Sequence, residues 1–358
     1  MQAQDLSPLL QQQVQQAYQQ KIPLCISGAN TKHWYGGLPQ GQALSLAKHS
    51  GIVSYDPTEL VITARAGTPL VEIEAALAEH QQHLAFEPPH FGTAASLGGT
   101  IAANFSGPAR PYWGSARDFV LGCQLINGKG EILKFGGQVM KNVAGYDVSR
   151  LMTGSLGTLG ILLEISLKVL PKPTTELTLV QELAPENALQ QLQQASLKPY
   201  PISAACWYNG HFYLRLSGSQ GAVKQASKEL KGDLLDDTAT FWKSLREHRL
   251  SFFKPQLPLW RLSLPLDAPL LKLEGDCLYD WGGAQRWLHS EATAEDIRVV
   301  VSSAGGSATL FRSPSDQLHR AGLVFHPLEA GLLRYHRALK QSFDPAGICN
   351  PQRLYPEF

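Results

Sequence analysis

The most regular hydrophobic pattern lies in residues 161–170, ILLEISLKVL. Every second side chain from Ile161 to Val169 is apolar, so these side chains would share one face of a β-strand and bury it in a core. The strand should end at Pro171-Lys172-Pro173, because proline has no backbone N–H to give to a sheet. The sequence therefore predicts a domain boundary at this point.

Similar patterns predict elements earlier in the chain. Residues 1–20 have the spacing of an amphipathic helix, 21–27 (KIPLCIS) form an apolar run typical of a buried strand, and 61–67 (VITARAG) alternate as a strand. Residues 118–135 indicate two strands joined by the turn Asn127-Gly128-Lys129-Gly130. A sheet built from these strands and residues 161–170 is therefore expected.

A helix should follow the strand at residues 61–67. Thr68 would cap this helix and Pro69 would be its first residue, a position where the missing N–H of proline costs nothing. Three apolar side chains at helical spacing would form its buried stripe: Leu70, Ile73 and Leu77.

The pattern changes after residue 173, where strand-like and helical segments alternate. The strand-like segments are 176–183, 202–216, 259–264 and 276–281, and the helical segments are 185–196, 219–231 and 294–304. This order predicts an α+β domain, with a suggestion of two related halves but no clear sequence repeat. The chain then returns to a helical segment, GLLRYHRALKQSF, and a tail broken by Pro and Gly.

Composition narrows the function classes. The 358 residues are 44% hydrophobic and 17% charged, which is typical of a globular protein of about two domains. A formal net charge of +1 argues against nucleic-acid binding, and no stretch approaches the ~18–20 apolar residues of a membrane span. The N-terminus lacks the pattern of a secretory signal. The chain is therefore expected to be cytoplasmic.

The number and spacing of the cysteines also favour a cytoplasmic protein. The five cysteines are widely spaced and include no C-x-x-C pair. An odd count at such spacing favours neither a disulfide framework nor a zinc or iron–sulfur site, so no metal is expected.

Glycine-rich segments carry the strongest chemical signal. Residues 27–32 (SGANTK) follow a strand and would let backbone N–H groups converge on an anion. Residues 96–104 (SLGGTIAAN) have almost no side chains and would let the backbone approach a flat ligand closely. Two further segments are 154–160 (GSLGTLG) and Asn350-Pro351 in the tail. Taken singly, the loop at 27–32 is more often only a turn and the 154–160 spacing is a weak signal. The run at 96–104 is harder to explain by structure alone, because a loop rarely needs so many consecutive small residues.

Taken in order, these segments resemble the FAD-binding domain shared by vanillyl-alcohol oxidase, p-cresol methylhydroxylase, D-lactate dehydrogenase and the flavin subunits of glycolate oxidase. The motifs that carry the resemblance are ISGANTK, ITARAGTPLVEIEAAL, EPPHFG, SLGGTIAANFSG, GSLGTLGI and DPAGICNP. They span residues 21–171 and 344–353.

The resemblance implies an α+β fold of three parts. A two-part FAD-binding domain would occupy residues 1–173, divided near residue 57. A ferredoxin-like α+β cap would occupy residues 174–330, and residues 331–358 would return to the FAD domain.

The resemblance also implies which residues bind FAD. Those expected on the diphosphate are Ser27, Gly28, Ala29, Asn30, Thr31 and Lys32. Those expected along the isoalloxazine and ribityl chain are Ser96, Leu97, Gly98, Gly99, Ala103 and Asn104, and Pro88 is also expected at the cofactor. Gly157, Gly160 and Ile161 would pass beside the adenine half, and Asn350 would close the site. The first loop has Ala-Asn-Thr where some relatives carry a linking His or Cys, so the FAD should be non-covalent.

A closer resemblance is to the smaller FAD-binding subunits of bacterial glycolate oxidases, carried by IVSYDPTELVITARAGTPL, FGGQVMKNVAGYDVSRLM and YDWGGAQRW. It implies a complex with a larger FAD-containing subunit and an iron–sulfur subunit, acting on a small 2-hydroxy acid. Such a complex could lie against the inner face of the membrane.

Catalytic residues are harder to find. Oxidation of a hydroxy acid by flavin needs a base for the hydroxyl proton and a cation for the carboxylate. Residues 174–345 hold no Glu-His-Gly motif, and their histidines (211, 248, 289, 319, 326 and 336) are scattered. Arg261, Arg312 and Trp281 are candidates, although a strand end and a turn explain these residues more simply than catalysis does. A stand-alone oxidase of a hydroxy acid or sugar lactone, and a non-catalytic scaffold, are the alternative functions.

Overall fold

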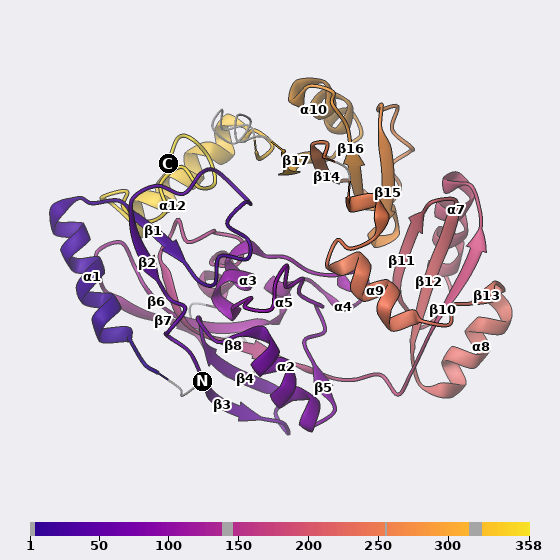
Figure 1. Cartoon of the computed structure of the whole chain (residues 1–358), viewed down its shortest axis with the longest axis horizontal. Helices are drawn as coiled ribbons and strands as arrows, with labels where there is room; N and C mark the ends of the chain where they lie inside the picture. Colours follow the sequence, from indigo (N-terminus) through magenta and orange to yellow (C-terminus); the bar gives the residue numbers. More distant parts are fainter. Residues whose placement is uncertain (1–3, 138–145, 255, 315–323) are drawn as a thin grey trace. The chain divides into compact units, whose positions relative to one another are not determined.

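The computed structural model describes residues 4–137, 146–254, 256–314 and 324–358. The motif FGGQVMKNVAGYDVSRLM and His319 therefore lie partly or wholly outside the described residues. The chain divides into two compact units (Figure 1). Unit 1 comprises Met1–Phe105, Ser115–Pro171 and Pro327–Phe358, and unit 2 comprises Ser106–Gly114 and Lys172–His326.

The larger part of unit 1 is built on a five-stranded antiparallel sheet in the order β3-β4-β8-β6-β7. Its strands are β3 (Ile52–Asp56), β4 (Val61–Arg65), β6 (Val120–Ile126), β7 (Ile132–Gly136) and β8 (Ile161–Lys168). The predicted apolar face of β8 is completely buried, which explains its central place in the sheet. The helices of this part are α2 (Leu70–Glu79), α3 (Leu97–Ala103), α5 (Ala116–Phe119) and α6 (Tyr146–Leu151).

The smaller part of unit 1 holds the two ends of the chain. Helix α1 (Ser7–Gln20) precedes β1 (Leu24–Ser27), which pairs in parallel with β2 (Gln42–Ser45). After α12 (Ala330–Phe343), the tail returns to β1, where Cys349 forms a parallel bridge with Leu24. The tail is thus part of the same layer as the loop that follows β1. A short pair, β5 (Gln82–His83) and β9 (Leu170–Pro171), completes the unit.

Unit 2 contains one eight-stranded antiparallel sheet in the order β13-β10-β12-β11-β15-β16-β14-β17. Its strands are β10 (Thr175–Glu182), β11 (Ile202–Tyr208), β12 (His211–Gly218), β13 (Asp233–Leu234), β14 (Leu259–Ser263), β15 (Asp276–Asp280), β16 (Gln285–His289) and β17 (Ser307–Arg312). Its helices are α4 (Arg110–Trp113), α7 (Pro185–Ser196), α8 (Gln220–Leu230), α9 (Thr238–Arg246) and α10 (Ala294–Ser303), with short turns η1 (Ser251–Phe253) and η2 (Trp281–Gly283).

The predicted α+β character of unit 2 is confirmed, and its strand order shows two related halves, each with the ferredoxin-like order. The first half, β10-α7-β11-β12-α8-β13, has its strands in the fourth-first-third-second order of that fold. The second half repeats this order with β14, β15, β16 and β17, and α10 occupies the place of the second helix. β11 and β15 join the halves into one sheet.

Several local expectations need correction. Thr68 does not cap α2: its hydroxyl bonds to the backbone of Gly51, and Pro69 takes the cap position. The strand expected at 202–216 is a hairpin with its turn at Asn209-Gly210, where both residues have positive φ. The predictions of α1, the β6–β7 hairpin and the buried stripe of α2 are confirmed.

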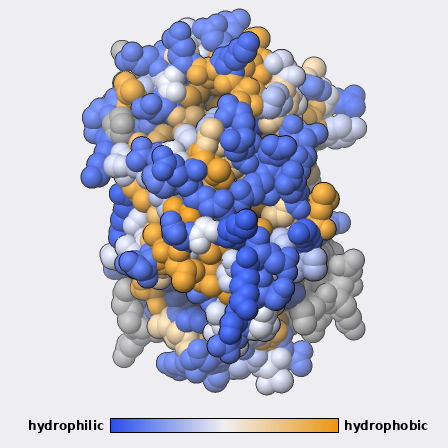
Figure 2. Space-filling model, turned by 90° about the vertical axis from the view of Figure 1, so that its right-hand side faces the viewer, coloured by the Kyte–Doolittle hydropathy of each residue, from blue (hydrophilic) through white to orange (hydrophobic). Residues whose placement is uncertain are grey.

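The surface carries scattered apolar residues. Figure 2 shows one face of the molecule, on which apolar residues lie in separate patches among polar ones. Leu197 and Leu234 of unit 2 are 85% and 65% exposed. Within the described residues, no helix has the length and apolar character needed to cross a membrane.

Candidate FAD-binding groove

A groove in unit 1 collects most of the residues predicted to bind a cofactor. Its first pocket encloses about 660 Å³, its open mouth included. The lining residues come from the loop after β1, from α3 and from the tail: Cys25, Ile26, Ser27, Gly28, Ala29, Asn30, Thr31, Lys32, His33, Pro39, Ser96, Gly99, Ala102, Ala103, Leu156, Asn350 and Arg353.

The loop after β1 offers backbone donors to this pocket. Among the described residues, the amides of Gly28, Ala29, Asn30 and Thr31 donate to no acceptor of the protein. Asn30 has a φ of 58°, so the loop alternates in handedness there, as anion-binding nests do. These N–H groups suit a negatively charged ligand.

The start of α3 forms the opposite wall. The Ser96 hydroxyl is buried and has no hydrogen-bond partner among the described residues. A Cβ on Gly28 would lie only 2.4 Å from this hydroxyl oxygen, whereas a Cβ on Gly99 would meet nothing closer than 3.3 Å. Gly28 therefore lets the two walls approach, and Gly99, where a Cβ would also come close to this hydroxyl, lines both pockets of the groove.

A second pocket of about 430 Å³ adjoins the first and shares seven of its lining residues: Ile26, Ser27, Gly28, Gly99, Ala102, Leu156 and Asn350. The residues that line only the second pocket are Leu46, Ala66, Gly98, Gly157, Gly160 and Leu162. None of its lining residues is charged. The groove is therefore polar at one end and apolar at the other.

The second pocket brings together two glycine segments that the sequence assigned to opposite halves of FAD. Gly98 and Gly99 lie beside Gly157 and Gly160, so one ring of a ligand would contact both. Gly98 also has a packing role, because a Cβ there would lie 2.7 Å from the Cβ of Ala66. This close approach packs α3 onto β4.

Asn350 clamps the walls rather than opening toward a ligand. Its side-chain oxygen accepts a hydrogen bond from the Ile26 amide at 2.6 Å. Its side-chain nitrogen donates to the Leu156 carbonyl at 2.7 Å and to the Ile26 carbonyl at 3.3 Å. The tail thereby connects β1 to the turn at residues 154–160.

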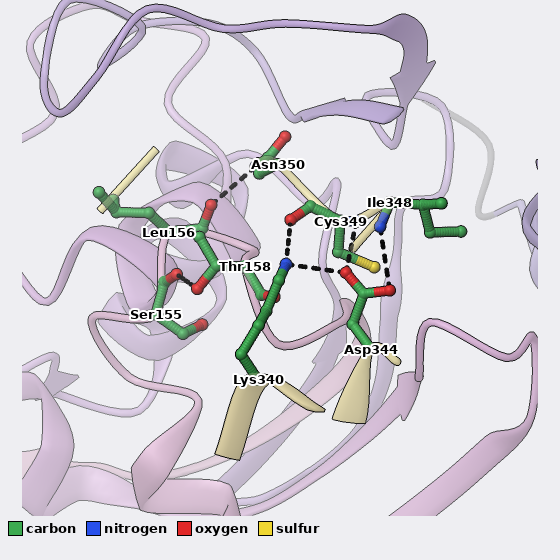
Figure 3. A network of polar contacts seen from close by, with 8 residues as sticks. All are labelled: Ser155, Leu156, Thr158, Lys340, Asp344, Ile348, Cys349 and Asn350. Carbon is green, nitrogen blue, oxygen red and sulfur yellow. Dashed lines mark hydrogen bonds and ion pairs between the residues drawn. The ribbon is translucent and has the colours of Figure 1, made fainter. Parts of the chain in front are cut away.

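A buried ion pair holds the tail in this position (Figure 3). The Lys340 ammonium on α12 lies 2.8 Å from the Asp344 carboxylate and donates to the carbonyls of Thr158 and Cys349, also at 2.8 Å. The same carboxylate accepts from the amides of Ile348 and Cys349. Every charge is matched here, which is what permits burial of Lys340 and Asp344.

Four predicted residues lie outside both pockets: Pro88, Leu97, Asn104 and Ile161. Pro88, Leu97 and Ile161 are buried. The Asn104 side-chain oxygen is buried without a donor among the described residues, and the residue ends α3 with a φ of 53°. Asn104 thus carries an unsatisfied acceptor, whereas the other three residues pack in the core.

The candidate catalytic arginines lie together in unit 2. The guanidinium carbons of Arg261 and Arg312 are 5.9 and 5.7 Å from the centre of the Phe311 ring. The His248 ring stacks on Phe253 at 3.9 Å and lies 5.2 Å from Phe311. Sequence reasoning named both arginines but treated His248 as scattered, because residues 248, 261 and 312 share no local pattern.

Desolvation sets the protonation of this cluster. Removal from water, followed by the charges of Arg312 and Arg261, holds the pKa of His248 well below its usual value. Burial lowers the pKa of Arg312 to about 10, so this guanidinium stays charged at neutral pH. The cluster therefore presents two cations beside a neutral imidazole, a set that suits a carboxylate.

Trp281, the third candidate catalytic residue, makes contacts within unit 2. Its indole N–H donates to the carbonyl of Gly107 at 2.9 Å, and the Arg110 guanidinium lies 4.4 Å from its ring centre. These contacts attach the segment around α4 to η2. No group of three or more His, Cys, Asp or Glu side chains suited to a metal ion occurs within the described ranges.

Comparison with known proteins defines the class. A family model described as an FAD binding domain matches residues 9–136. The solved structure of an alkyldihydroxyacetonephosphate synthase superposes with a TM-score of 0.66 at 16% identity, covering 96% of this chain and 75% of the other, which speaks to the fold alone. Fold and groove thus define an FAD-binding flavoprotein of the p-cresol methylhydroxylase type, and the predicted cofactor is confirmed as FAD.

The relatives narrow this class. The glycolate oxidase subunit GlcE of Escherichia coli (strain K12) is 50% identical over 353 residues, which are 99% of this chain and 98% of that protein. This chain belongs to the family of that subunit. A D-lactate dehydrogenase of Anaerostipes hadrus and glycolate oxidase subunit GlcD of Bacillus subtilis (strain 168) are 35% and 34% identical, each over 45% of this chain and 34% of its own length.

Proposed function

We propose that this chain is the FAD-binding subunit of a glycolate oxidase complex, which oxidises glycolate to glyoxylate. A larger FAD-containing subunit of the GlcD kind and an iron–sulfur subunit would be its partners, and the complex would work in the cytoplasm or against the inner face of the membrane. The similarity to GlcE over nearly the whole length of both chains supports this function.

The observation that carries the proposal is the division of the groove into a cationic and an apolar pocket. The first pocket holds the cations Lys32 and Arg353, four unpaired amides and no Asp or Glu among its lining residues. The second holds no charged group at all. A diphosphate beside a flat apolar ring has this distribution of charge, and FAD contains both.

The adenine ring is the better occupant of the second pocket. A flavin ring must face groups that hold the substrate and move its proton, and the second pocket is lined by no acidic, basic or histidine side chain. The isoalloxazine would then extend from the other end of the first pocket, where Ala103 lies. Gly157 and Gly160 would then lie beside adenine, as predicted, together with Gly98 and Gly99.

Bound FAD would supply the acceptor for a hydride from the hydroxy acid. The residues of this chain hold and orient it. The amides of Gly28–Thr31 would bind the diphosphate, and the Ser96 hydroxyl would gain a hydrogen-bond partner that the described part of the chain does not supply. Asn350 would act indirectly, by fixing the two walls.

The test is the visible spectrum of the full chain, purified alone and with its partner subunits, before and after glycolate is added without oxygen. We expect one FAD per chain, released by acid precipitation because the cofactor is held without a covalent bond. Retention of flavin in the precipitate would implicate Cys25 or His33, which both line the first pocket. A chain without flavin in either preparation would refute the proposal and favour a scaffold.

Reduction by glycolate then divides the roles of the subunits. Flavin that bleaches in the isolated chain would place a catalytic step in this subunit. Flavin that bleaches only in the complex would place that step in the larger partner and give this chain a relay role.

A further inference from the structure

Arg353 lies in the tail that follows α12, where no sequence pattern drew attention to it. It is only 8% exposed, yet it lines the first pocket together with the loop after β1. A buried arginine in a pocket wall needs an explanation, because arginine is rarely buried without a partner for its charge.

The position of Arg353 is fixed by the loop at residues 33–37. Its guanidinium donates to the carbonyls of Gly37 and His33, the latter at 2.7 Å. Its own carbonyl accepts from the Gly37 amide at 2.9 Å. A Cβ on Gly37 would lie 2.2 Å from the Gln352 carbonyl, so the glycine is what admits the tail here. The guanidinium is therefore held rigidly, with N–H donors left over beyond those two bonds.

The charge of Arg353 has no counterion among the residues that the structure describes. No carboxylate in this part of the chain forms an ion pair with it, and the hydrogen bonds of its guanidinium go to backbone carbonyls. Burial lowers its pKa to about 10, so it remains a cation at neutral pH. A buried charge that lacks an opposite charge is strongly unfavourable.

The surroundings indicate what would neutralise it. Lys32 is a second buried cation in the same wall, and none of the pocket's lining residues is acidic. The unpaired amides of Gly28–Thr31 face the same space. Cations and N–H donors around one pocket are the usual recognition set for phosphate groups.

We propose that Arg353 is the counterion of the FAD diphosphate, so that the C-terminal tail completes the cofactor site. This inference rests on the proposed function, since it assumes that the groove holds FAD. Arg353 would then bind the cofactor in addition to holding the loop at residues 33–37 in place. The tail and the cofactor would then bind cooperatively.

The two halves of FAD separate these roles experimentally. ADP carries the diphosphate, whereas riboflavin carries the flavin ring without any phosphate. In the full-length chain we would measure the dissociation constant of FAD by flavin fluorescence, and the constants of ADP and riboflavin by displacement of FAD. The variant is Arg353→Gln, and the matched control is Arg337→Gln, which removes one exposed cation from α12 of the same C-terminal region.

We expect Arg353→Gln to weaken FAD and ADP by about 10- to 100-fold, the range for a lost charge-assisted contact, and riboflavin by less than about two-fold. Arg337→Gln should change none of the three. Equal weakening of ADP and riboflavin would show that Arg353 only fastens the loop, and an unchanged affinity for ADP would equally overturn the inference. A wild-type chain that bound no FAD would instead refute the proposed function itself.

Discussion

The groove of unit 1 and the arginine cluster of unit 2 are built in opposite ways. The groove is walled by glycine, alanine and backbone N–H groups, and its side chains serve mainly to hold those walls. The cluster of unit 2 is built from large side chains, with His248 between Phe253, Trp287 and Phe311 at 3.9, 4.6 and 5.2 Å. Recognition depends on backbone geometry in the first case and on charged and aromatic groups in the second.

The difference predicts how each region responds to substitution. Adding a side chain to a wall made of backbone, or removing the contacts that hold this wall in place, should release the cofactor. Removing one side chain from the cluster of unit 2 should disrupt that cluster, whereas the cofactor should remain bound in the groove of unit 1. Substitutions in the tail should resemble those in the groove, because Asn350 and the Lys340–Asp344 pair hold the walls of the groove in place.

The largest effect is expected from Lys340→Met. Removing the ammonium leaves the carboxylate of Asp344 buried without its cation, which typically costs about 3–5 kcal/mol. The free energy of unfolding, measured with urea, should fall by that amount, and FAD should be lost with the tail. Arg334→Met on the exposed side of α12 is the control and should change stability by less than about 0.5 kcal/mol. A loss below about 1 kcal/mol for Lys340→Met would mean that the pair does not fasten the tail.

Gly99→Leu tests the backbone wall directly. Gly99 lines both pockets, and a Cβ there would already lie 3.3 Å from the Ser96 hydroxyl oxygen, so a leucine side chain would occupy the groove. FAD affinity should therefore fall at least about 100-fold, or ~2.7 kcal/mol, while the far-ultraviolet circular dichroism stays unchanged. Gly221→Leu, at an uncrowded glycine of α8, is the control and should leave FAD bound. If the Gly99 variant kept its flavin, the placement of FAD in this groove would be wrong.

Sequence was most informative where the fold uses spacing and small residues. The alternation of residues 161–169 identified the central strand, and the glycine segments identified most of the groove's lining. The Thr68 cap was wrong because a hydroxyl can satisfy other backbone groups, here those of Gly51. The Asn209-Gly210 turn had a recognisable signal, since Asn-Gly favours the positive φ values of tight hairpins.

The rest depended on contacts between distant residues. The sequence did not predict β16, because this strand contains the buried Arg286. An arginine in a pattern of polar and apolar residues normally indicates an exposed position. The guanidinium of Arg286 donates to the carbonyls of Ala268, Pro269 and Gly283, and no local pattern shows this. Arg353 was missed for the same reason, since its partners lie more than 300 positions earlier in the chain.

A substitution in unit 2 tests the other side of the comparison. If the cations beside Phe311 hold the carboxylate of the substrate, Arg312→Gln in the assembled complex should raise the KM for glycolate about 10- to 100-fold. FAD affinity should stay within about two-fold of the wild type. Arg249→Gln, at an exposed position of the same unit, should change neither quantity. An unchanged KM for the Arg312 variant would assign this cluster to the core of unit 2.

The smallest effect concerns pH and one buried histidine of unit 1. His49 is fully buried, its Nδ1 accepts from the Leu6 amide at 3.0 Å, and its Nε2 lies 3.1 Å from the Leu163 carbonyl. Nδ1 must therefore be unprotonated in the folded chain. Burial lowers the pKa of His49, against an opposing attraction from Asp5, and Arg65 adds a further lowering.

The sign of the pH effect follows from this lowered pKa. The unfolded chain takes up a proton near pH 6.5 while folded His49 does not, so stability is lost as pH falls below about 6.5, by at most about 1.4 kcal/mol per pH unit. His49→Gln keeps a donor and an acceptor but cannot titrate, and it should flatten the urea-unfolding free energy between about pH 6.5 and 5 relative to wild type. His80→Gln, at an exposed histidine, should leave the slope unchanged. An equal slope in the His49 variant would assign the acid sensitivity to other histidines whose pKa is lowered by desolvation, such as His248 of unit 2 and His336 of unit 1.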